Sequence, residues 1–338
     1  MEGKWFQSDS NNSDVVLFSK IRLARNLSEA PFPERMSAEL RKSVSKKLYA
    51  AIKSSPLANE FDLINLFDIS ASKAASYCEK QLISKEHLKN KEQASFMLKK
   101  NEDVSIMLCE EDHIRINAFA PGDNLEEAYK KADEVDDVFI KALKIAFSEK
   151  LGFLTASPIN LGTGLKASFA LHLPALRNTN SIYKLSSMVG KLGLSLREMF
   201  KDGAGDIYIL SNQVSLGISE KSAIDNLCAI CSQIVKQERA ARENLKENID
   251  FEDRIFRTLG ILKTARKLST EEFLNNLSNL RLGASLGYFD IDYKTIGEML
   301  FNLQNASLID SAEAELTEPM LDKLRAQIVR EKLSSFSQ

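Results

Sequence analysis

The stretch from Asp103 to Leu151 constrains the fold of this chain more than any other part of its sequence. Its first half, DVSIMLCEEDHIRINAFAPG, has the alternation of two strands and ends in a Pro-Gly turn. Its second half, DNLEEAYKKADEVDDVFIKALKIAFSEKL, has the spacing of a long amphipathic helix, with Asp123 or Asn124 as its N-cap. The chain must therefore fold into a structure that combines paired strands with helices.

The rest of the chain divides into a mixed part and a helical part. Strand patterns occur at 14–27, within 152–176 and at 205–217, where GDIYILSNQVSLG predicts a hairpin that turns at Ser211, Asn212 and Gln213. Helical spacing occurs at 37–58, 70–98 and 181–192. After Gly217 the patterns are helical, first over 219–246 and then from Phe251 onward. This change of character predicts a domain boundary near residue 245.

Composition and charge exclude some classes of partner. Of the 338 residues, 44% are apolar, which is enough for a sizeable core, and a net charge of −2 provides no general attraction for nucleic acid or an anionic membrane. The sequence contains no apolar run long enough to span a bilayer, and MEGKWFQSDSNNSD at its start lacks the basic and apolar regions of a signal peptide. We therefore expect a cytoplasmic protein with no nucleic-acid or membrane partner.

The four cysteines predict buried thiols rather than a disulfide framework or a metal site. A reducing cytoplasm keeps thiols free, and a chain of this length does not need disulfides to fold. Cys228 and Cys231 form a C-x-x-C pattern, but the surrounding residues have helical spacing, and no second cysteine pair or histidine accompanies them. We expect both cysteines on a core helix, and we expect no metal site built from protein side chains.

The segment from Glu110 to Arg115 places five ionisable groups in six residues of a predicted strand. Alternation would put Glu111, His113 and Arg115 on one face of that strand. Such a cluster on its own fits a solvated edge strand with paired charges. It also fits a base and a phosphate-binding cation that act together, and the other segments of the chain favour this second alternative.

Five segments carry residues of this chemical type in order along the chain. They are SKIRLARN, CEEDHIR, SPINLGTGLKAS, LREMFKDG and ILSNQVSLG. In this order they resemble the ATP:guanido phosphotransferases and, within that superfamily, the bacterial protein-arginine kinases of the McsB type. DRIFRTLGILKTARKLSTEEF and LSNLRLGASLG resemble the C-terminal helical domain of those kinases. The resemblance therefore covers nearly the whole chain.

The resemblance implies an α+β fold of the phosphagen-kinase, glutamine-synthetase-like type. Residues 1–245 would form the catalytic domain, with a small helical part at about 30–100 and an antiparallel sheet flanked by helices at about 101–245. Residues 246–338 would form an all-helical domain for dimerisation and substrate recognition. The implied reaction uses ATP and Mg²⁺ to phosphorylate arginine side chains of proteins, and the implied assembly is a homodimer. A kinase of free arginine is the weaker alternative, because the tail matches the protein-arginine kinases.

A guanidinium acceptor explains why a carboxylate is needed. Its lone pairs are delocalised and its pKa exceeds ~12, so it is a poor nucleophile. A carboxylate that binds it in a bidentate manner and takes a proton during attack addresses both difficulties. By its match to the family's Asn-Glu-Glu-Asp-His-x-Arg motif, Glu111 would be this carboxylate and Arg115 would bind phosphate. Asp202, in LREMFKDG, is the second catalytic candidate.

Transfer of a γ-phosphoryl group also requires cations around the phosphates. The resemblance assigns the ATP-binding positions of this chain residue by residue. They are Ser19, Lys20, Arg22, Gln81, Arg115, Lys166, Ala167, Ser168 and Arg197.

This sequence departs from the family mainly at the positions that would bind ATP or take part in catalysis. Lysine replaces arginine at positions 20 and 166, which keeps the charge but loses the planar fork that holds two phosphate oxygens. The loop with Lys201 and Asp202 is shorter than the family's loop and lacks its carboxylate. Further replacements are Gln81 for histidine, Cys109 for asparagine, Ser157 for cysteine and Ile159 for threonine. Since losing one preorganised donor costs roughly 10²–10³ in rate, the alternative function is a weak or inactive pseudokinase that acts as a nucleotide- or protein-binding regulatory scaffold.

LDKLRA at residues 321–326 matches the family's phosphoarginine-binding Arg-Asp-x-x-Arg-Ala motif in part. Asp322 and Arg325 match, whereas Leu321 replaces the first arginine. The pair is therefore a candidate phosphoarginine pocket. An ordinary surface ion pair between residues three apart on a helix is the alternative.

Overall fold

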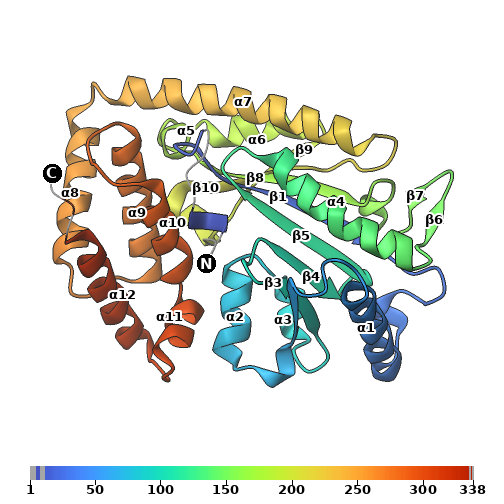
Figure 1. The fold of residues 1–338 in the computed structure, drawn as a ribbon. Coiled ribbons are helices and arrows are strands. Elements are labelled where there is room, and N and C mark those ends of the chain that lie inside the picture. Colours follow the sequence, from blue (N-terminus) through green and yellow to red (C-terminus); the bar gives the residue numbers. More distant parts are fainter. Residues whose placement is uncertain (1–4, 8–11, 335, 337–338) are drawn as a thin grey trace.

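The computed structural model describes residues 5–7, 12–334 and 336 (Figure 1). Its centre is an eight-stranded sheet in the order β2-β3-β4-β5-β1-β8-β10-β9, in which all neighbouring strands are antiparallel. The strands are β1 (Val16–Arg25), β2 (Phe61–Asn65), β3 (Ser95–Lys99), β4 (Val104–Leu108), β5 (Ile114–Pro121), β8 (Leu165–His172), β9 (Leu194–Glu198) and β10 (Ile207–Asn212). Two short strands, β6 (Phe147–Ser148) and β7 (Gly152–Phe153), form a separate hairpin.

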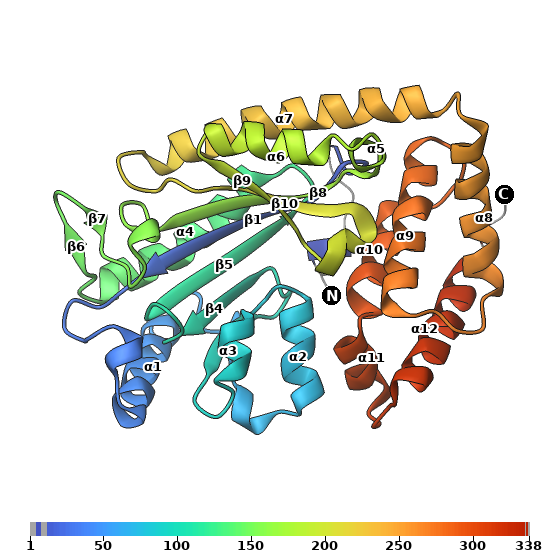
Figure 2. The ribbon, with the colours of Figure 1, turned by 180° about the vertical axis from the view of Figure 1, so that it is seen from behind.

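Helices cover one face of this sheet. They are α1 (Ala38–Lys53), α4 (Leu125–Ala142), α5 (Pro174–Asn178), α6 (Ile182–Lys191) and α7 (Glu220–Leu245). Figure 1 shows α4 in front of the strands, and Figure 2, the view from behind, shows the strands in front of α4. The opposite face, called the open face below, borders α2 (Ala71–Glu79) and α3 (Lys85–Lys89). Short 3-10 turns connect these elements: η1 (Trp5–Gln7), η2 (Pro33–Arg35), η3 (Leu66–Asp68), η4 (Pro158–Asn160) and η5 (Lys201–Asp206).

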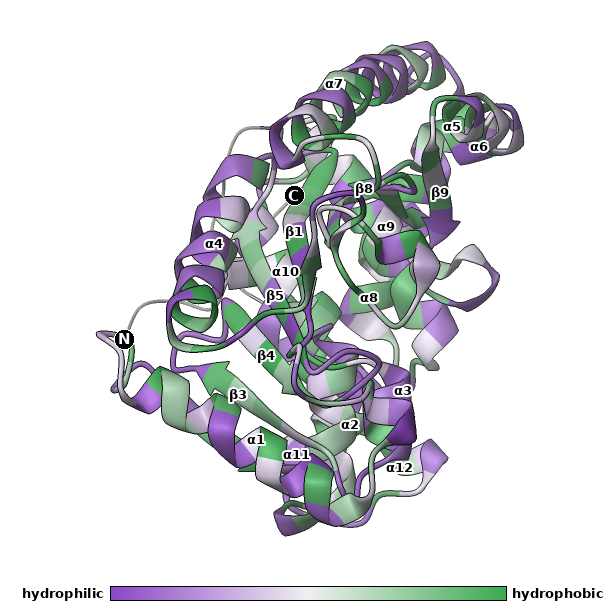
Figure 3. Cartoon of the chain, turned by 90° about the vertical axis from the view of Figure 1, so that its right-hand side faces the viewer, coloured by the Kyte–Doolittle hydropathy of each residue, from purple (hydrophilic) through white to green (hydrophobic). Residues whose placement is uncertain are grey.

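Alternation along the strands makes the two faces chemically different. On β1, Ile21 and Leu23 are buried in the core under the covering helices, so Lys20 and Arg22 lie on the open face. A one-residue slip would exchange the faces, and fully burying one large apolar side chain is worth ~1.5–3 kcal/mol. The register is therefore strongly determined. Figure 3 shows hydrophobic residues along β3, β4 and β8, whereas α4 and α7 mix hydrophilic and hydrophobic residues.

The C-terminal helices form a group at one end of the molecule (Figure 1). They are α8 (Ile249–Thr264), α9 (Thr270–Ser285), α10 (Tyr293–Asn302), α11 (Asn305–Ala312) and α12 (Glu318–Leu333). A second core joins them to the open face of the sheet. In it Trp5 stacks on Phe119 at 4.7 Å between ring centroids and meets the edges of Phe18 and Phe301. The N-terminal turn thus fills the space between β1, β5 and α10.

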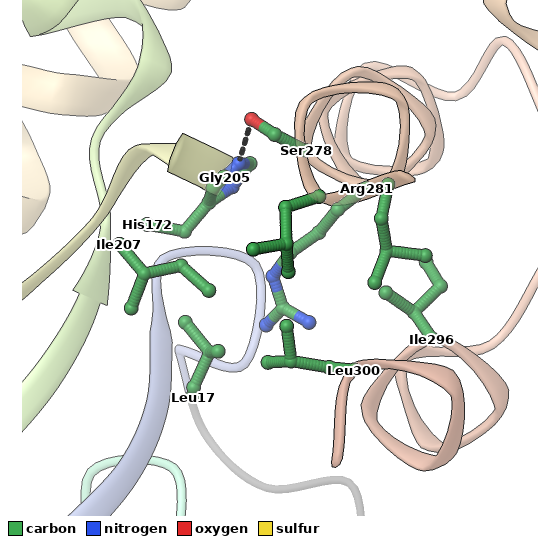
Figure 4. A pocket seen from close by; sticks show the side chains of 10 residues that line it. Leu17, His172, Gly205, Ile207, Ser278, Arg281, Ile296 and Leu300 are labelled. Carbon is green, nitrogen blue, oxygen red and sulfur yellow. Dashed lines mark hydrogen bonds between the residues drawn. The ribbon is translucent and has the colours of Figure 1, made fainter. Parts of the chain in front are cut away.

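A buried polar chain also crosses this junction (Figure 4). Nε2 of His172, at the end of β8, lies 2.8 Å from Oγ of Ser278 on α9, and that hydroxyl donates to Asp206 at 2.5 Å. Burial, with the nearby Arg242 and Arg281, lowers the pKa of His172 well below its usual value, so the ring is neutral. Leu17, Ile207, Ile296 and Leu300 enclose these groups. The helical group is therefore fixed to the sheet by both apolar and polar contacts.

Most of the sequence expectations for the elements are confirmed, with two corrections. The strand pair at 103–122, the helix after Asn124 and the core helix with Cys228 and Cys231 are β4, β5, α4 and α7. The prediction of helix over 70–98 was wrong at the end of this range, where β3 forms a strand that pairs with β2 and β4. The prediction of a hairpin within 205–217 was also wrong, because Ile207–Asn212 is a single strand. Ser211 and Asn212 belong to β10, where Asn212 binds the N–H of Ala167 and the carbonyl of Leu165.

The helical part expected at about 30–100 contains α1, α2 and α3, and it also contributes β2 and β3 to the sheet. Near the predicted boundary, α7 ends at Leu245 and α8 begins at Ile249. None of the helices in the described ranges combines the length and the apolar character needed to cross a bilayer.

Candidate active site

The central strands of the open face carry aligned rows of polar side chains. Arg22 on β1 pairs with Lys166 on β8 and with Asn117 on β5, so these three residues form one row. One step along the strands, Lys20 pairs with Ser168, which pairs with Ser211 on β10. The sheet register therefore brings together residues from four sequence segments. It places Lys20, Arg22, Lys166 and Ser168 next to one another.

A cationic cleft lies over these rows. It consists of two adjoining cavities of about 360 Å³ and about 150 Å³, which share Gln81, Lys166 and Ile209. Lys20, Arg22 and Ser168 line the smaller cavity, and Arg197 on β9 lines the larger one. Gln81, which follows α2, lines both cavities. Six of the nine predicted ATP-binding residues thus line one cleft, and Arg115 lines a second cleft.

The lysines of the cationic cleft are strongly perturbed. Burial, with the Arg22 and Arg115 guanidinium groups, lowers the pKa of Lys20 to about 7. Burial, with Arg22, Arg197 and Arg115, lowers the pKa of Lys166 to about 8. Nζ of Lys20 donates to the carbonyl of Gln81 at 3.0 Å and lies over the Phe119 ring, whereas the side chain of Lys166 has no hydrogen bond or ion pair with any described residue. Several cations therefore share a site with few counter-charges.

Two arginines in the site keep an unused donor. Arg22 donates through one terminal nitrogen to Asn160 of η4 at 3.0 Å, while its Nε is buried and has no acceptor among the described residues. Nε of Arg115 is also buried without an acceptor in the described part of the chain. Leaving a buried donor unsatisfied costs ~1–3 kcal/mol. A polyphosphate bound beside these arginines would neutralise the cluster of cations, so the site fits the phosphates of a nucleotide.

A second cleft, the carboxylate cleft, is lined in part by Arg115, whose charge also acts on Lys20, Arg22 and Lys166 of the cationic cleft. Its cavity is about 610 Å³, and it is lined by Glu34, Arg41, Glu86, Asn90, Glu110, Glu111, Arg115 and Ala156. Four glutamates and two arginines thus face one space. Carboxylates in this number suit a cationic group, which they can bind through charge-assisted hydrogen bonds.

The segment from Glu110 to His113 is a loop, so the expectation that Glu111, His113 and Arg115 share a strand face was wrong. Cys109 leaves β4 with a left-handed φ of 50°, and β5 begins only at Ile114. His113 is buried: its Nδ1 accepts from the N–H of Leu27 and its Nε2 donates to the carbonyl of Pro31, each at 2.9 Å. His113 therefore has a structural role.

The acidic residues of this loop have separate roles. Asp112 is fully buried and accepts hydrogen bonds from Asn26 at 2.6 Å and from the N–H of Ala156 at 2.8 Å. Glu110 forms an ion pair with Arg115 and accepts from Ser84 at 2.7 Å. Burial raises the pKa of Glu110, but Arg115 and its hydrogen bonds outweigh burial, so the pKa is lowered overall. Both residues fix the loop that carries Glu111.

Glu111 is the accessible carboxylate at this position. Its side chain is 42% exposed, and one carboxylate oxygen lies 3.5 Å from a terminal nitrogen of Arg115. It therefore reaches the carboxylate cleft while remaining next to Arg115. This location agrees with the expected role of Glu111.

Three predicted residues lie elsewhere. Ser19 and Ala167 alternate onto the face covered by helices, where the Ser19 hydroxyl donates to the carbonyl of Gly122 at 2.6 Å. Asp202 is 80% exposed, pairs with Lys201 at 3.7 Å and lines neither cleft. The η5 turn that carries Asp202 is held against the C-terminal helices by the bond from the Gly205 N–H to Asn275. The structure thus does not bring Asp202 to Glu111.

Arg325 also differs from the expectation. It is fully buried, and its five N–H donors bind the carbonyls of Leu303 and Leu268 and the side chains of Asp322, Thr270 and Asn305. A guanidinium has five N–H groups, so none is left for a phosphate. The pair is therefore neither an open phosphoarginine pocket nor an ordinary surface ion pair. We call Arg325 a buried hub, because its one guanidinium binds five groups from separate segments of the C-terminal helical part.

The residues that the sequence prediction missed are those that support the named ones. Asn160 was quoted within SPINLGTGLKAS but was not singled out, although it holds Arg22. Ser84 and Glu110 hold Arg115 through contacts between α3 and the loop. Asn160 had a sequence signal in its position within a matching motif, whereas Ser84 had none.

Comparisons with known proteins agree with this geometry. Residues 43–241 match the ATP:guanido phosphotransferase C-terminal catalytic domain, and residues 248–338 match the protein-arginine kinase McsB C-terminal domain. Among solved structures, lombricine kinase is similar with a TM-score of 0.59, 19% identity and coverage of 72% of this chain and 70% of that chain. The duplicated taurocyamine kinase of Schistosoma mansoni, with bound transition-state-analogue components, has a TM-score of 0.60, 22% identity and coverage of 79% and 40%. These similarities confirm the predicted phosphagen-kinase fold.

Relatives with higher identity extend over nearly the full length. A protein-arginine kinase of Clostridium acetobutylicum is 40% identical over 336 residues, which cover 97% of this chain and 99% of the relative. The protein-arginine kinases of Clostridium novyi and Halothermothrix orenii are 40% and 39% identical, with 98% of this chain covered in each case and 98% and 96% of the relatives. With both of its parts matched and the cations and Glu111 gathered at two clefts, this chain belongs to the ATP:guanido phosphotransferase family and, within it, to the protein-arginine kinases.

Proposed function

We propose that this protein transfers the γ-phosphoryl group of ATP to arginine side chains of proteins. The observation that carries the proposal is the position of Arg115, which lines the carboxylate cleft and lies close enough to Lys20, Arg22 and Lys166 to lower their pKa values. On one side lie cations with unused donors, and on the other lies Glu111, a carboxylate that a guanidinium can reach. A phosphate donor and a cationic acceptor would thus meet at one residue.

In this proposal the side chains act mainly by binding and orienting the charged groups of the two substrates. Lys20, Arg22 and Lys166 bind the phosphates of ATP, and Arg115 binds the γ-phosphate as charge moves toward ADP. Glu111 holds the acceptor guanidinium and takes its proton. The guanidinium nitrogen forms a bond to phosphorus, the bond to the ADP oxygen breaks, and the proton passes to Glu111.

Magnesium fits this site only through the nucleotide. The described residues contain no group of three or more histidine, cysteine, aspartate or glutamate side chains arranged to hold a metal. Mg²⁺ is commonly held by substrate phosphates together with one or two carboxylates, and not by a cage made entirely of protein groups. When bound with ATP it would neutralise charge on the phosphates.

The proposal includes a homodimer formed through residues 246–338 and a cytoplasmic location, where ATP is available. The support for a dimer is the exposed apolar surface of α8, where Ile249 is 72% exposed and Phe256 and Ile261 are partly exposed. Sedimentation of the full chain tests the oligomeric state.

The reaction itself can be tested with purified protein, Mg²⁺, ATP and an arginine-rich protein. We expect acid-labile phosphate on arginine side chains, detected by mass spectrometry. ATP should also raise the melting temperature of the protein by ligand linkage, and Arg22→Ala should abolish most of that rise. Lys184→Ala, which removes an exposed cation from α6, is the matched control. ATP binding by the wild type without any phosphoarginine would instead identify a pseudokinase.

The affinity for ATP should fall as the pH rises from 7 to 9. Without nucleotide, Lys20 and Lys166 have pKa values of about 7 and about 8, so both lose protons in this range. Bound phosphates favour the charged forms and raise both pKa values, so the complex carries more protons than the free protein. Binding therefore takes up protons, and affinity should fall at least ~10-fold over this range.

Calorimetric titrations at pH 8 in buffers of different ionisation enthalpy measure this uptake. The double variant Lys20→Arg and Lys166→Arg should bind ATP more tightly and with a smaller pH dependence, since arginine stays charged. Binding without proton uptake in the wild type would contradict the lowered pKa values of these lysines.

A further inference from the structure

Helix α2 contacts both the cationic cleft and the C-terminal helices. At its C-terminal end, Cys78 and Gln81 line the cationic cleft. Gln81 adopts a left-handed φ of 62°, and its carbonyl accepts the hydrogen bond from Nζ of Lys20 at 3.0 Å. Since Lys20 is one of the phosphate-binding candidates, the position of α2 sets the position of a cation in the site.

Glu79 of the same helix binds the C-terminal helices. Its carboxylate accepts hydrogen bonds from the N–H groups of Ala306 and Ser307 and from the Ser307 hydroxyl, each at 2.8 Å. Ala306 and Ser307 lie in the first turn of α11, so Glu79 caps a helix N-terminus that belongs to another part of the chain. Lys73 of α2 also pairs with Asp310 of α11 at 3.0 Å. Figures 1 and 2 both show α2 and α11 side by side.

The first turn of α11 is itself fixed by the Arg325 hub. Asn305, its first residue, accepts hydrogen bonds from Arg325 and from Thr270, the latter at 3.0 Å. A continuous set of contacts therefore runs from Arg325 through Asn305 and the first turn of α11 to Glu79. From Glu79 it continues along the end of α2 to Gln81 and Lys20.

We propose that Glu79 is a positioning residue for the nucleotide, through which the C-terminal helices set the affinity of the catalytic site for ATP. This inference rests on the proposed function, because it treats Lys20 as a phosphate ligand. The coupling between the C-terminal helices and the catalytic site is measured as a change in the affinity for ATP. Loss of Glu79 removes its hydrogen bonds to the first turn of α11, which loosens the end of α2 and lets the Gln81 carbonyl move away from Lys20.

The experiment compares Glu79→Ala and Glu79→Gln with the wild type in the full chain. For Glu79→Ala we expect the Kd and KM for ATP to rise ~10-fold, because a charge-assisted contact that orders a ligand residue is lost, while kcat stays within about twofold. Glu79→Gln keeps an oxygen acceptor for α11 and should recover most of the affinity. Lys332→Met is the control, because it removes an ion pair with Glu298 within the C-terminal helices and does not touch α2. It should leave the Kd unchanged.

Direct calorimetry separates failure of this inference from failure of the proposed function. An unchanged Kd for ATP in Glu79→Ala would overturn the positioning role while leaving the kinase proposal intact. A Kd raised equally in Lys332→Met would also overturn it, because the effect would then reflect general loosening of the C-terminal helices. Absence of ATP binding in the wild type would refute the function and the inference together.

Discussion

Replacement of Glu111 by glutamine is expected to slow phosphoarginine formation by roughly two or more orders of magnitude. Glutamine keeps the size of the side chain and part of its hydrogen bonding, but it removes the base and the anionic contact with the guanidinium. Glu110 and Asp112 cannot take over, because Glu110 is paired with Arg115 and Asp112 is buried between Asn26 and Ala156. Asp202 lies outside both clefts. Catalysis should therefore depend on Glu111 alone among the loop carboxylates.

The measurement is the initial rate of phosphoarginine formation at saturating ATP, together with the ATP-induced rise in melting temperature. That rise should be nearly the same as in the wild type, since Glu111 lies on the acceptor side of Arg115. Glu34→Gln is the matched control, because Glu34 lines the same cleft and is exposed, and its rate should stay within about threefold of the wild type. An active enzyme that is indifferent to Glu111→Gln would show that another group positions the guanidinium.

The sequence predicted the site best where function coincides with strand alternation. Lys20 and Arg22 are two residues apart on β1, and Lys166 and Ser168 are two apart on β8, so each pair had to share a face. Alternation alone could not show which strands pair. The alignment of Arg22 with Lys166 needs the crossing from β1 to β8, which are separated by about half of the chain.

The same alternation misled where the chain leaves the sheet. Glu110 to His113 continues the strand pattern in sequence, but the left-handed Cys109 ends β4, and His113 is held by Leu27 and Pro31. Those partners are distant in sequence, so no local pattern could reveal them. β3 was missed for a related reason, because Phe96 and Met97 fit a helical spacing and become a strand only by pairing between β2 and β4.

Lysine in place of arginine at positions 20 and 166 changes how the charge of the site depends on pH, which composition could not show. An arginine at position 20 or 166 would remain charged in a buried cluster of cations, whereas lysine responds by losing part of its charge near neutral pH. The site can therefore reduce its own repulsion when no phosphate is bound. Its affinity for ATP then becomes dependent on pH, as proposed above.

Replacement of Arg325 by leucine should destabilise the C-terminal helices by about 3–5 kcal/mol, because it removes a buried guanidinium together with all of its hydrogen bonds. Leucine fills much of the volume but leaves the carbonyls of Leu268 and Leu303 buried without their donor. It also frees Asn305 at the start of α11. Urea unfolding followed by fluorescence of Trp5, which packs against Phe301 of α10, should show an earlier transition for this part of the chain.

Asp322→Asn is the matched control, because Asp322 is only one of five partners of Arg325 and its side chain is partly exposed. It should cost no more than ~1–2 kcal/mol. The two interpretations of LDKLRA predict different results. A hub predicts a large loss of stability for Arg325→Leu whether or not phosphoarginine is present. A ligand pocket predicts a stable variant that has lost stabilisation by phosphoarginine, and that result would require Arg325 to exchange its five internal partners for a phosphate.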